Sequence, residues 1–311
     1  MECGNGHDVL GGHLAVLGGD RRSRYLAEAL AEKEWKVFSF GVEKGKKKRH
    51  ISEEYEVREV PTVEEALRGA GAVLLPQPAF VRERQLFCPF NEGEAPTAEK
   101  IFSCLSGDVP VFGGRLSPAM TEYATRCGIR LIDYMKLEDV QLRNALPTAE
   151  GAIYLAMQQL ERTIDGAKVA VLGYGRIGFL LAQKLQFLGA HVTVAVRKSR
   201  DAAALENQHL EVLRMRFEGG ESSLQKLQEG YDVVFNTVPY RILGGDILRG
   251  MPPETLLMEL ASAPGGWDPS EQIPCRTCYA PGLPGSFAPQ TAGKILAECL
   301  EPLLEREGKR P

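Results

Sequence analysis

The segment Lys168–Arg197 constrains the fold most, because it has the pattern of a complete strand–helix–strand unit. An apolar run at Val169–Leu172 leads through a glycine-rich turn into a helix pattern at Phe179–Leu188 and a second β-rich run at Val192–Val196. G-x-G-x-x-G in this context is typical of dinucleotide-binding domains, where the glycines allow a tight turn, approach of a pyrophosphate and close helix–strand packing. We predict that the whole turn binds the cofactor: Gly173, Tyr174, Gly175, Arg176, Ile177 and Gly178.

The residues after the second strand favour NADP(H) over NAD(H). An NAD site usually has Asp or Glu there, which accepts hydrogen bonds from the ribose hydroxyl. Here the strand is followed by a basic cluster with a hydroxyl group, which attracts a 2′-phosphate instead. The alternative is a solvated basic turn without a cofactor role. The residues predicted to hold the phosphate are Arg197, Lys198, Ser199 and Arg200.

A chain of 311 residues is long enough for two domains. Apolar β-type runs alternate with amphipathic segments throughout, which predicts parallel sheets with crossover helices. The predicted fold class is α/β, with two doubly wound, Rossmann-like domains. We place a substrate domain at 1–142, a connecting helix at 143–165 and the NADP-binding domain at 166–290. A C-terminal helix at 291–311 is expected to pack on the first domain.

Local signals give finer expectations. Ser23 is predicted to cap the first helix, which would end near Trp35, and Phe80–Glu94 has no clear periodicity and is predicted to be a loop. In the connecting segment, Pro147 and Glu150 suit the first turn of a helix.

Composition excludes several classes of protein. The net charge of −4 gives no general attraction to nucleic acid or to anionic membranes, and the basic run Lys44–His50 is short and lacks interleaved aromatic residues. No apolar run is long enough to span a bilayer, and the first residues do not resemble a secretory signal, so we expect a cytoplasmic protein. Cys275 and Cys278 form a C-x-x-C pair without nearby His ligands, which favours reduced thiols over a metal site.

Ligands of doubly wound sheets bind at the carboxyl ends of the strands, and several motifs fall at such ends. We expect two of them to lie near the nicotinamide half of the cofactor, although each alone could be an ordinary turn. No His lies in a strand-end motif or after position 209, which argues against the His-assisted chemistry of common 2-hydroxyacid dehydrogenases. Carboxylates remain as acid–base candidates: Asp20, Glu150 and Glu259. The nicotinamide-side residues are Asn236, Thr237, Val238, Pro239, Ala261 and Ser262.

Seven motifs occur in an order that resembles one known family. They are VLGGDRR (16–22), NALPTAEGA (144–152), VLGYGRIG (171–178), NTVP (236–239), ELASAPGG (259–266), APGLPG (280–285) and APQTAG (288–293). Over nearly the whole chain the sequence is similar to the family of the dipicolinate synthase A-subunit. The resemblance implies NADP-dependent oxidation of a dihydrodipicolinate-type precursor from the lysine pathway to pyridine-2,6-dicarboxylate, which accumulates in bacterial endospores. It also implies a partner, the flavoprotein-like B-subunit of the synthase, and a location in the mother cell.

A dicarboxylate substrate requires cationic or N–H-rich anchors, which arginines and glycine turns supply. The sequence departs from the family at Ala263 and Gln290, where we expect basic residues, and at Glu259, where Asp is more usual. These departures leave two alternatives open: another two-domain NADP-dependent hydroxyacid oxidoreductase, or an NADP-sensing protein without catalysis. A homo-oligomer is also expected. The predicted substrate residues are Arg22, Arg115, Arg143, Thr148, Gly265, Gly282 and Gly285.

Overall fold

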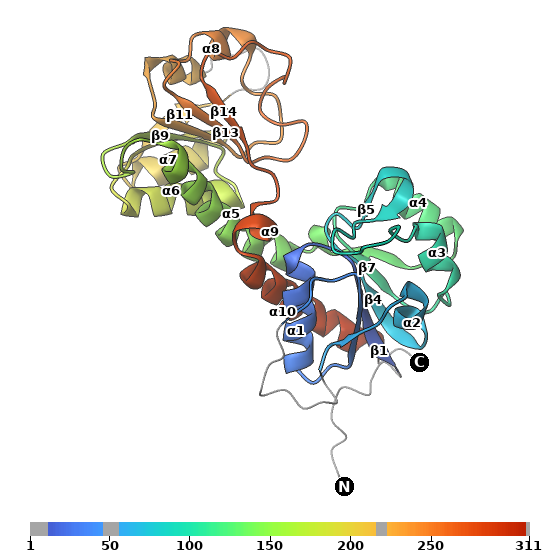
Figure 1. Ribbon diagram of the computed structural model, residues 1–311. Coiled ribbons are helices and arrows are strands. Elements are labelled where there is room, and N and C mark those ends of the chain that lie inside the picture. Colours follow the sequence, from blue (N-terminus) through green and yellow to red (C-terminus); the bar gives the residue numbers. More distant parts are fainter. Residues whose placement is uncertain (1–11, 46–55, 216–222, 309–311) are drawn as a thin grey trace. The chain divides into compact units, whose positions relative to one another are not determined.

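The computed structural model describes residues 12–45, 56–215 and 223–308 (Figure 1). The chain divides into two compact units. The first unit comprises Met1–Asn144 with Pro284–Pro311, and the second comprises Ala145–Leu283. Most of the basic run at 44–50 lies outside the described residues. Among the described helices, none is both long and apolar enough to cross a bilayer.

The first unit is built on a six-stranded sheet in the order β3-β2-β1-β4-β7-β8, in which every neighbouring pair is parallel. This is the doubly wound topology predicted from the alternating sequence pattern. The strands are β1 (His13–Leu17), β2 (Val37–Phe40), β3 (Arg58–Glu59), β4 (Ala70–Leu74), β7 (Val111–Gly113) and β8 (Leu131–Asp133). The helices are α1 (Arg21–Glu32), α2 (Val63–Leu67), α3 (Ala98–Ser103) and α4 (Pro118–Arg126).

Two local expectations for this unit are wrong. Helix α1 begins before Ser23: Asp20 is its N-cap and accepts a hydrogen bond from the Arg22 backbone N–H at 3.0 Å. Residues 80–94 are not wholly a loop, because β5 (Phe80–Val81) pairs antiparallel with β6 (Gln85–Leu86) around the single turn η3 (Arg82–Arg84). Pieces this short leave too few residues for a recognisable period.

The connecting segment is one helix, α5 (Glu138–Gln159), which is earlier at both ends than the predicted 143–165. Glu138 and Asp139 occupy its first turn, where carboxylates complement the positive end of the helix. Pro147 lies inside the helix and not in its first turn, so the rule that places Pro at a helix start was misleading here.

The second unit has a second six-stranded parallel sheet, in the order β11-β10-β9-β12-β13-β14. Strand order reverses between β9 and β12, which is where ligands bind in folds of this kind. The strands are β9 (Lys168–Leu172), β10 (His191–Val196), β11 (Glu211–Arg214), β12 (Val233–Asn236), β13 (Leu256–Glu259) and β14 (Arg276–Tyr279). The helices are α6 (Arg176–Phe187), α7 (Ser199–Glu206) and α8 (Gly245–Arg249), and residues 223–229 form the 3₁₀ helix η5 (Ser223–Glu229).

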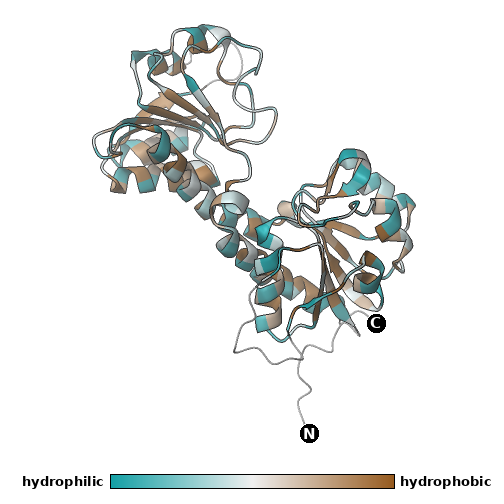
Figure 2. Ribbon diagram, in the orientation of Figure 1, coloured by the Kyte–Doolittle hydropathy of each residue, from teal (hydrophilic) through white to brown (hydrophobic). Residues whose placement is uncertain are grey.

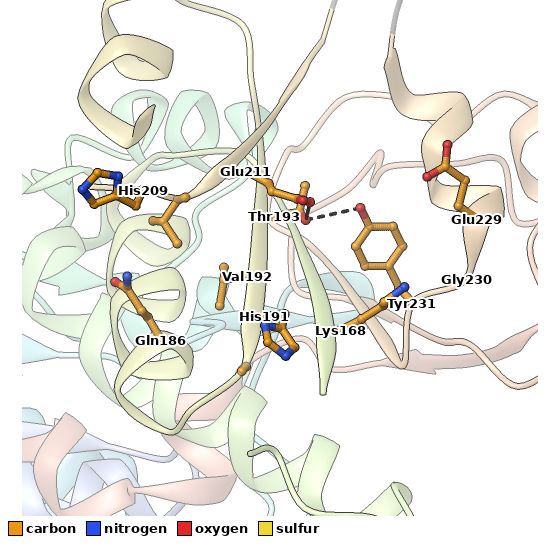
Figure 3. Close-up of a pocket in the computed structure, with 12 residues that line it drawn as sticks. Lys168, Gln186, His191, Val192, Thr193, His209, Glu211, Glu229, Gly230 and Tyr231 are labelled. Atoms are coloured by element: carbon orange, nitrogen blue, oxygen red, sulfur yellow. Dashed lines mark hydrogen bonds between the residues drawn. The ribbon is translucent and has the colours of Figure 1, made fainter. Parts of the chain in front are cut away.

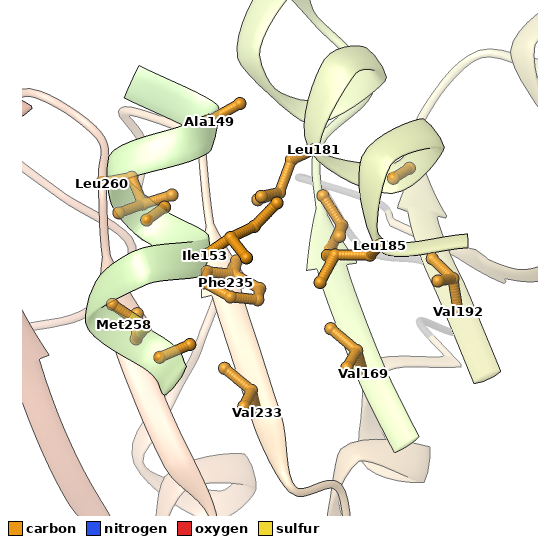
Figure 4. Packing of buried hydrophobic residues seen from close by; sticks show 14 of the residues in the cluster. Ala149, Ile153, Val169, Leu181, Leu185, Val192, Val233, Phe235, Met258 and Leu260 are labelled. Atoms are coloured by element: carbon orange, nitrogen blue, oxygen red, sulfur yellow. The ribbon is translucent and has the colours of Figure 1, made fainter. Parts of the chain in front are cut away.

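Each sheet is apolar and is covered by amphipathic helices, as the hydropathy colouring shows (Figure 2). In the second unit, α5 and α6 cover one face of the sheet. Ile153 of α5 and Leu181 and Leu185 of α6 pack with Val169 and Phe235 of the strands (Figure 4). This burial holds the strand ends, and the turns that follow them, in fixed positions.

The C-terminal residues form α9 (Leu283–Phe287) and α10 (Pro289–Gly308). Helix α10 packs along α1 of the first unit, with Leu296, Leu300 and Leu304 in the same buried cluster as Leu26 and Leu30. The predicted fold class is confirmed, including the return of the last helix to the first domain.

Candidate functional site

The glycine-rich turn after β9 has the geometry that a dinucleotide requires. Gly173 has φ +99°, and a Cβ there would lie 2.6 Å from Thr237 Oγ1. A Cβ at Gly178 would collide with the Gly173 carbonyl oxygen, so helix and turn can approach only without side chains. At Gly175, by contrast, a Cβ would have no atom within 4 Å. The turn therefore packs against the protein at Gly173 and Gly178 and faces open space at Gly175, where a pyrophosphate would approach.

The N-terminus of α6 lacks a side-chain partner for its first N–H groups. Gly175 is the N-cap, no side chain makes a capping hydrogen bond, and the first turn holds no acidic residue. Arg176 is exposed there, whereas Tyr174 is half-buried with its ring 5.6 Å from that of Phe179. Uncapped N–H groups and the positive end of a twelve-residue helix form a site suited to phosphate.

The basic cluster follows β10 at the same edge of the sheet. Arg197, Lys198, Ser199 and Arg200 are all exposed, and Lys198 is the N-cap of α7 without a side-chain capping bond. Arg200 pairs with Asp201 at 3.2 Å. The cluster therefore presents cations and a second helix N-terminus where an NAD site would have an acidic residue.

Two nicotinamide-side residues have their polar groups occupied within the protein. The Asn236 side chain is fully buried: its Nδ2 donates to the Val238 carbonyl at 3.0 Å and its Oδ1 accepts from the Val238 N–H at 3.1 Å. Thr237 Oγ1 donates to the Leu172 carbonyl at 2.8 Å. These side chains hold the turn after β12 against β9, and Pro239 is an exposed residue of that turn.

Glu259 is the centre of a hydrogen-bond network that fixes the turn after β13. Its Oε1 accepts from Asn236 Nδ2 at 2.7 Å and from the Ala261 N–H at 2.9 Å, and its Oε2 accepts from the Gly266 N–H at 2.6 Å. Burial raises the pKa of the Glu259 carboxyl, and these hydrogen bonds act in the opposite direction. Glu259 is only 6% exposed, so its place is structural rather than that of a proton acceptor for a ligand.

The same network explains Gly265, which we predicted as a substrate residue. Gly265 has φ +77°, and a Cβ there would lie 2.9 Å from Glu259 Oε2. Ala261 is half-buried and Ser262 is exposed beside it. Gly282 also has a positive φ, +75°, which favours glycine, but no atom lies within 4 Å of a Cβ placed there.

In the first unit, Asp20 and Arg22 form a partly buried ion pair at the carboxyl end of β1. Arg22 Nε lies 2.9 Å from Asp20 Oδ1, and Arg22 Nη2 lies 2.7 Å from Asp20 Oδ2. The same guanidinium donates to the Gln77 side chain at 2.9 Å and to the Gln77 carbonyl at 2.7 Å. A Cβ at Gly285 would lie 2.8 Å from both partners of the pair. Gln77, which we did not predict, thus completes a cluster with three predicted site residues.

Other predicted residues lie away from any strand end. Arg143 on α5 pairs with Glu298 on α10, which ties two helices of the first unit together. Glu150 pairs with Lys184 of α6 at 2.9 Å on an exposed surface, and Thr148 is half-buried on α5. The salt bridge between Arg143 and Glu298 could not be read from local sequence, and the role of Arg143 as a substrate anchor stays a prediction.

The second unit also has a cavity of about 520 Å³ at the opposite edge of its sheet (Figure 3). Lys168, His191 and Glu211, which begin β9, β10 and β11, line it. Tyr231 and Thr193 lie 3.3 Å apart through their hydroxyls, and Thr193 Oγ1 donates to Glu211 Oε2 at 3.0 Å. Because the cavity lies at the strand starts, it is separate from the turns that follow the strands.

In the described part of the chain, no three His, Cys, Asp or Glu side chains gather as metal ligands. The cysteines there are free thiols, and Cys278 accepts a hydrogen bond from Gln159 Nε2 at 3.1 Å. Burial raises the pKa of the Cys275 thiol, as expected for an inert structural cysteine.

Two doubly wound units, one with an open dinucleotide turn, define the fold class of NAD(P)-linked oxidoreductases. Comparison with known sequences agrees with this fold class. Residues 13–135 match the family described as the N-terminal domain of the dipicolinate synthase A-subunit, and residues 168–248 match the family described as NADP oxidoreductase coenzyme F420-dependent.

The chain is 31% identical to the dipicolinate synthase A-subunit of Bacillus subtilis over 94% of its length and 95% of the relative's. It superposes on the crystal structure of the dipicolinate synthase A-subunit from Bacillus halodurans with a TM-score of 0.81 at 30% identity, covering 97% and 99% of the two chains. A transhydrogenase from Sinorhizobium meliloti shares the fold, with a TM-score of 0.64 at 16% identity over 90% and 88% of the chains. The chain belongs to the family of the dipicolinate synthase A-subunit.

Proposed function

We propose that this chain oxidises a dihydrodipicolinate-type precursor to pyridine-2,6-dicarboxylate, with NADP⁺ as the hydride acceptor. The observation that carries the proposal is the open turn at Gly175 before the uncapped α6, in a chain of this family. The family supplies the substrate class, and the turn supplies the reason to expect a dinucleotide. On this proposal the protein works in the mother cell of a sporulating bacterium, as a homo-oligomer and with a flavoprotein-like B-subunit.

The residues present fit the cofactor. The first N–H groups of α6 would hold the pyrophosphate, and Arg197 to Arg200 would hold the 2′-phosphate. The turns at 236–239 and 261–266 would flank the nicotinamide half, and Glu259 fixes both turns through its three hydrogen bonds. The bound nicotinamide would take the hydride from the substrate ring.

The chemistry places modest demands on the protein. The substrate ring loses a hydride and a proton, and the product gains aromatic stabilisation, so the proton can leave without a strong imidazole base. Asp20 and Glu150, predicted as acid–base groups, each have a basic partner, Arg22 and Lys184 respectively. The contribution we propose for the chain is therefore mainly to orient cofactor and substrate.

The direct test supplies the full chain with freshly generated 4-hydroxytetrahydrodipicolinate and NADP⁺ or NAD⁺, with and without the B-subunit. Reduced cofactor and dipicolinate absorbance should rise together, and faster with NADP⁺. Binding of NADP⁺ without product under any of these conditions would favour a sensing protein, in line with Ala263 and Gln290 at positions where we expected cations. Turnover of a different carboxylate would favour the other oxidoreductase.

The preference for NADP⁺ has its own test. Lys198→Gln should lower kcat/KM for NADP⁺ by about tenfold, because one charge-assisted phosphate contact is lost, and should leave NAD⁺ unchanged. Lys226→Gln, an exposed lysine of η5 in the same unit, is the matched control. Equal losses with both cofactors would contradict a 2′-phosphate site at this cluster.

A further inference from the structure

A second pocket, of about 330 Å³, lies in the first unit and is lined by three arginines. Two of them, Arg82 and Arg84, come from the turn between β5 and β6, and Arg115 comes from the segment between β7 and α4. Figure 1 shows this hairpin beside α4. We propose that this pocket binds a small planar dicarboxylate, the chemical class of the proposed substrate and product. This inference rests on the proposed function for the identity of its ligand.

The charges in the pocket match a dianion. Arg84 is already paired with Glu99 at 2.7 Å and lies over the Tyr123 ring, 3.9 Å from its centroid. Arg82 and Arg115 are exposed, and the structure shows no ion-pair partner for either among the residues that it describes. Asp133 makes no ion pair with either arginine among the described residues, and its two oxygens accept from the Leu116 and Met135 N–H groups. Two unneutralised guanidinium groups suit two carboxylates.

The rest of the lining suits a flat ring. Phe80, Val81, Leu116 and Met120 contribute apolar surface, and Met120 is buried. Phe80 is fixed from behind by an edge contact with Phe102, at 6.1 Å between ring centroids. A pocket with apolar lining residues and a few charged groups is typical of small-molecule sites, and its volume of about 330 Å³ lies at the small end of their range.

The backbone is strained at two of these arginines. Arg84 has φ +67° and Arg115 has φ +56°, and they are two of four non-glycine residues with positive φ in the described ranges. A left-handed conformation costs a residue with a Cβ about 1 kcal/mol, so folds seldom retain it without a reason. Here the strained positions are ones that line the pocket.

The experiment uses the full chain in metal-free buffer with pyridine-2,6-dicarboxylate as probe, and calorimetry as the measurement. Arg82→Gln and Arg115→Gln should each weaken binding by about tenfold, and the double variant should abolish it. Arg126→Gln, at the other end of α4, is the control and should bind normally. The neutral pyridine-2,6-dicarboxamide should not bind. No binding by the unaltered chain, or equal binding by the double variant, would overturn the proposal.

Arginine modification by phenylglyoxal gives a readout that does not depend on variants. The probe should protect Arg82 and Arg115, as found by peptide mass analysis, and protection of other arginines only would overturn the assignment.

Steady-state kinetics show whether the pocket binds the substrate or the product. A raised KM for the substrate in Arg115→Gln marks a substrate site, and weaker product binding at unchanged KM marks a product site. Arginine-dependent binding without turnover would sink the proposed function alone, whereas turnover with unaffected variants would sink the pocket alone.

Discussion

The two units share a topology and differ at the turn after their first strand. In the first unit the turn is filled by the protein itself: Asp20 caps α1 and pairs with Arg22, which donates to Gln77. In the second unit the corresponding N-cap is Gly175, with open space around it and no capping side chain. The same position in the same fold therefore stabilises one helix internally and leaves the other available to an external anion.

The comparison of the turns after β1 and β9 indicates that a strand–turn–helix unit does not by itself form a nucleotide site. Gly18 and Gly19 follow β1 much as Gly173 follows β9, and all three have positive φ. A Cβ at Gly18, however, would lie 2.6 Å from the Phe87 carbonyl, so this turn is covered by its own chain. What distinguishes the second unit is the unfilled space outside Gly175. The chain's two tryptophans, Trp35 and Trp267, lie one in each unit, so their fluorescence reports on the two units separately.

The largest effect is expected in the first unit. Asp20→Ala removes the N-cap of α1 and leaves the mostly buried Arg22 guanidinium without its counter-ion, which should lower the free energy of unfolding by about 3 kcal/mol. Urea unfolding followed by Trp35 fluorescence in a Trp267→Phe background measures this. Arg21→Ala, which removes an exposed partner of Glu43, is the control and should cost less than about 0.5 kcal/mol. Similar costs for both variants would mean that the filled turn is not a stabilising element.

The next largest effect is expected when the turn before α6 is given an acidic N-cap like that of α1. Gly175→Asp places a carboxylate at the N-cap of α6, where its extended backbone, φ −85° and ψ −162°, accepts any residue. We expect NADP⁺ binding to weaken about 100-fold, because the carboxylate occupies the N–H groups and repels phosphate, while the second unit stays as stable as before. Calorimetric titration with NADP⁺ and Trp267 fluorescence measure the two quantities.

Gly175→Asn separates capping from charge in that experiment. Asn caps about as well as Asp but carries no charge, so its loss of affinity should be smaller. If Gly175→Asp bound NADP⁺ as tightly as the unaltered chain, the open turn would not be the phosphate site.

A third, smaller effect concerns the network around Glu259. Glu259→Gln replaces one acceptor oxygen by an NH₂ group, which must then face either the Gly266 N–H or another donor. We expect a loss of about 2 kcal/mol in the second unit, as for a buried donor left unpaired. Trp267, which follows Gly266, reports the change in a Trp35→Phe background. Glu254→Gln, an exposed change just before β13, should be neutral, and a neutral Glu259→Gln would show that the turn is held by other contacts.

The sequence alone was sufficient for the α/β class and the glycine turn, because these depend on short-range patterns. The return of the last helix was also expected, but from the usual arrangement of two-domain dehydrogenases and not from a local pattern. Burial produces the apolar runs of β9 and β12, and backbone sterics produce the glycines at 173 and 178. Residues whose role depends on distant partners could not be assigned in the same way. Arg143, predicted as a substrate anchor, pairs with Glu298, 155 residues away in the chain, and no local pattern indicates this contact.

The arginine pocket is a second example of a feature that could not be predicted fully from the sequence. Arg115 was recognised because it follows a strand, but Arg82 and Arg84 lay in a stretch without periodicity. A three-residue 3₁₀ turn between two-residue strands carries no repeat that sequence reasoning can detect. Only the folded hairpin places these residues beside α4.

The smallest effect expected is a difference between the units in their response to acid. His13 begins β1 and is 7% exposed, with Nε2 donating to the Ala66 carbonyl at 2.8 Å and its ring stacked on Phe38. Burial lowers the pKa of the His13 imidazole below its usual value, and the nearby charges of Lys36 and Arg58 act in the same direction. The first strand of the second unit begins instead at the exposed Lys168.

Since the unfolded imidazole binds a proton more readily than the folded one, lowering the pH favours the unfolded state. The first unit should lose stability as the pH falls below about 6.5, the usual His value, and the loss should stop below the lowered folded pKa. Urea unfolding at pH 7.5 and 5.5, followed by Trp35, measures it, and His13→Gln should remove the His13 share while keeping an amide donor. An unchanged pH dependence in that variant would assign the acid sensitivity to other groups, and an equal dependence reported by Trp267 would remove this difference between the units.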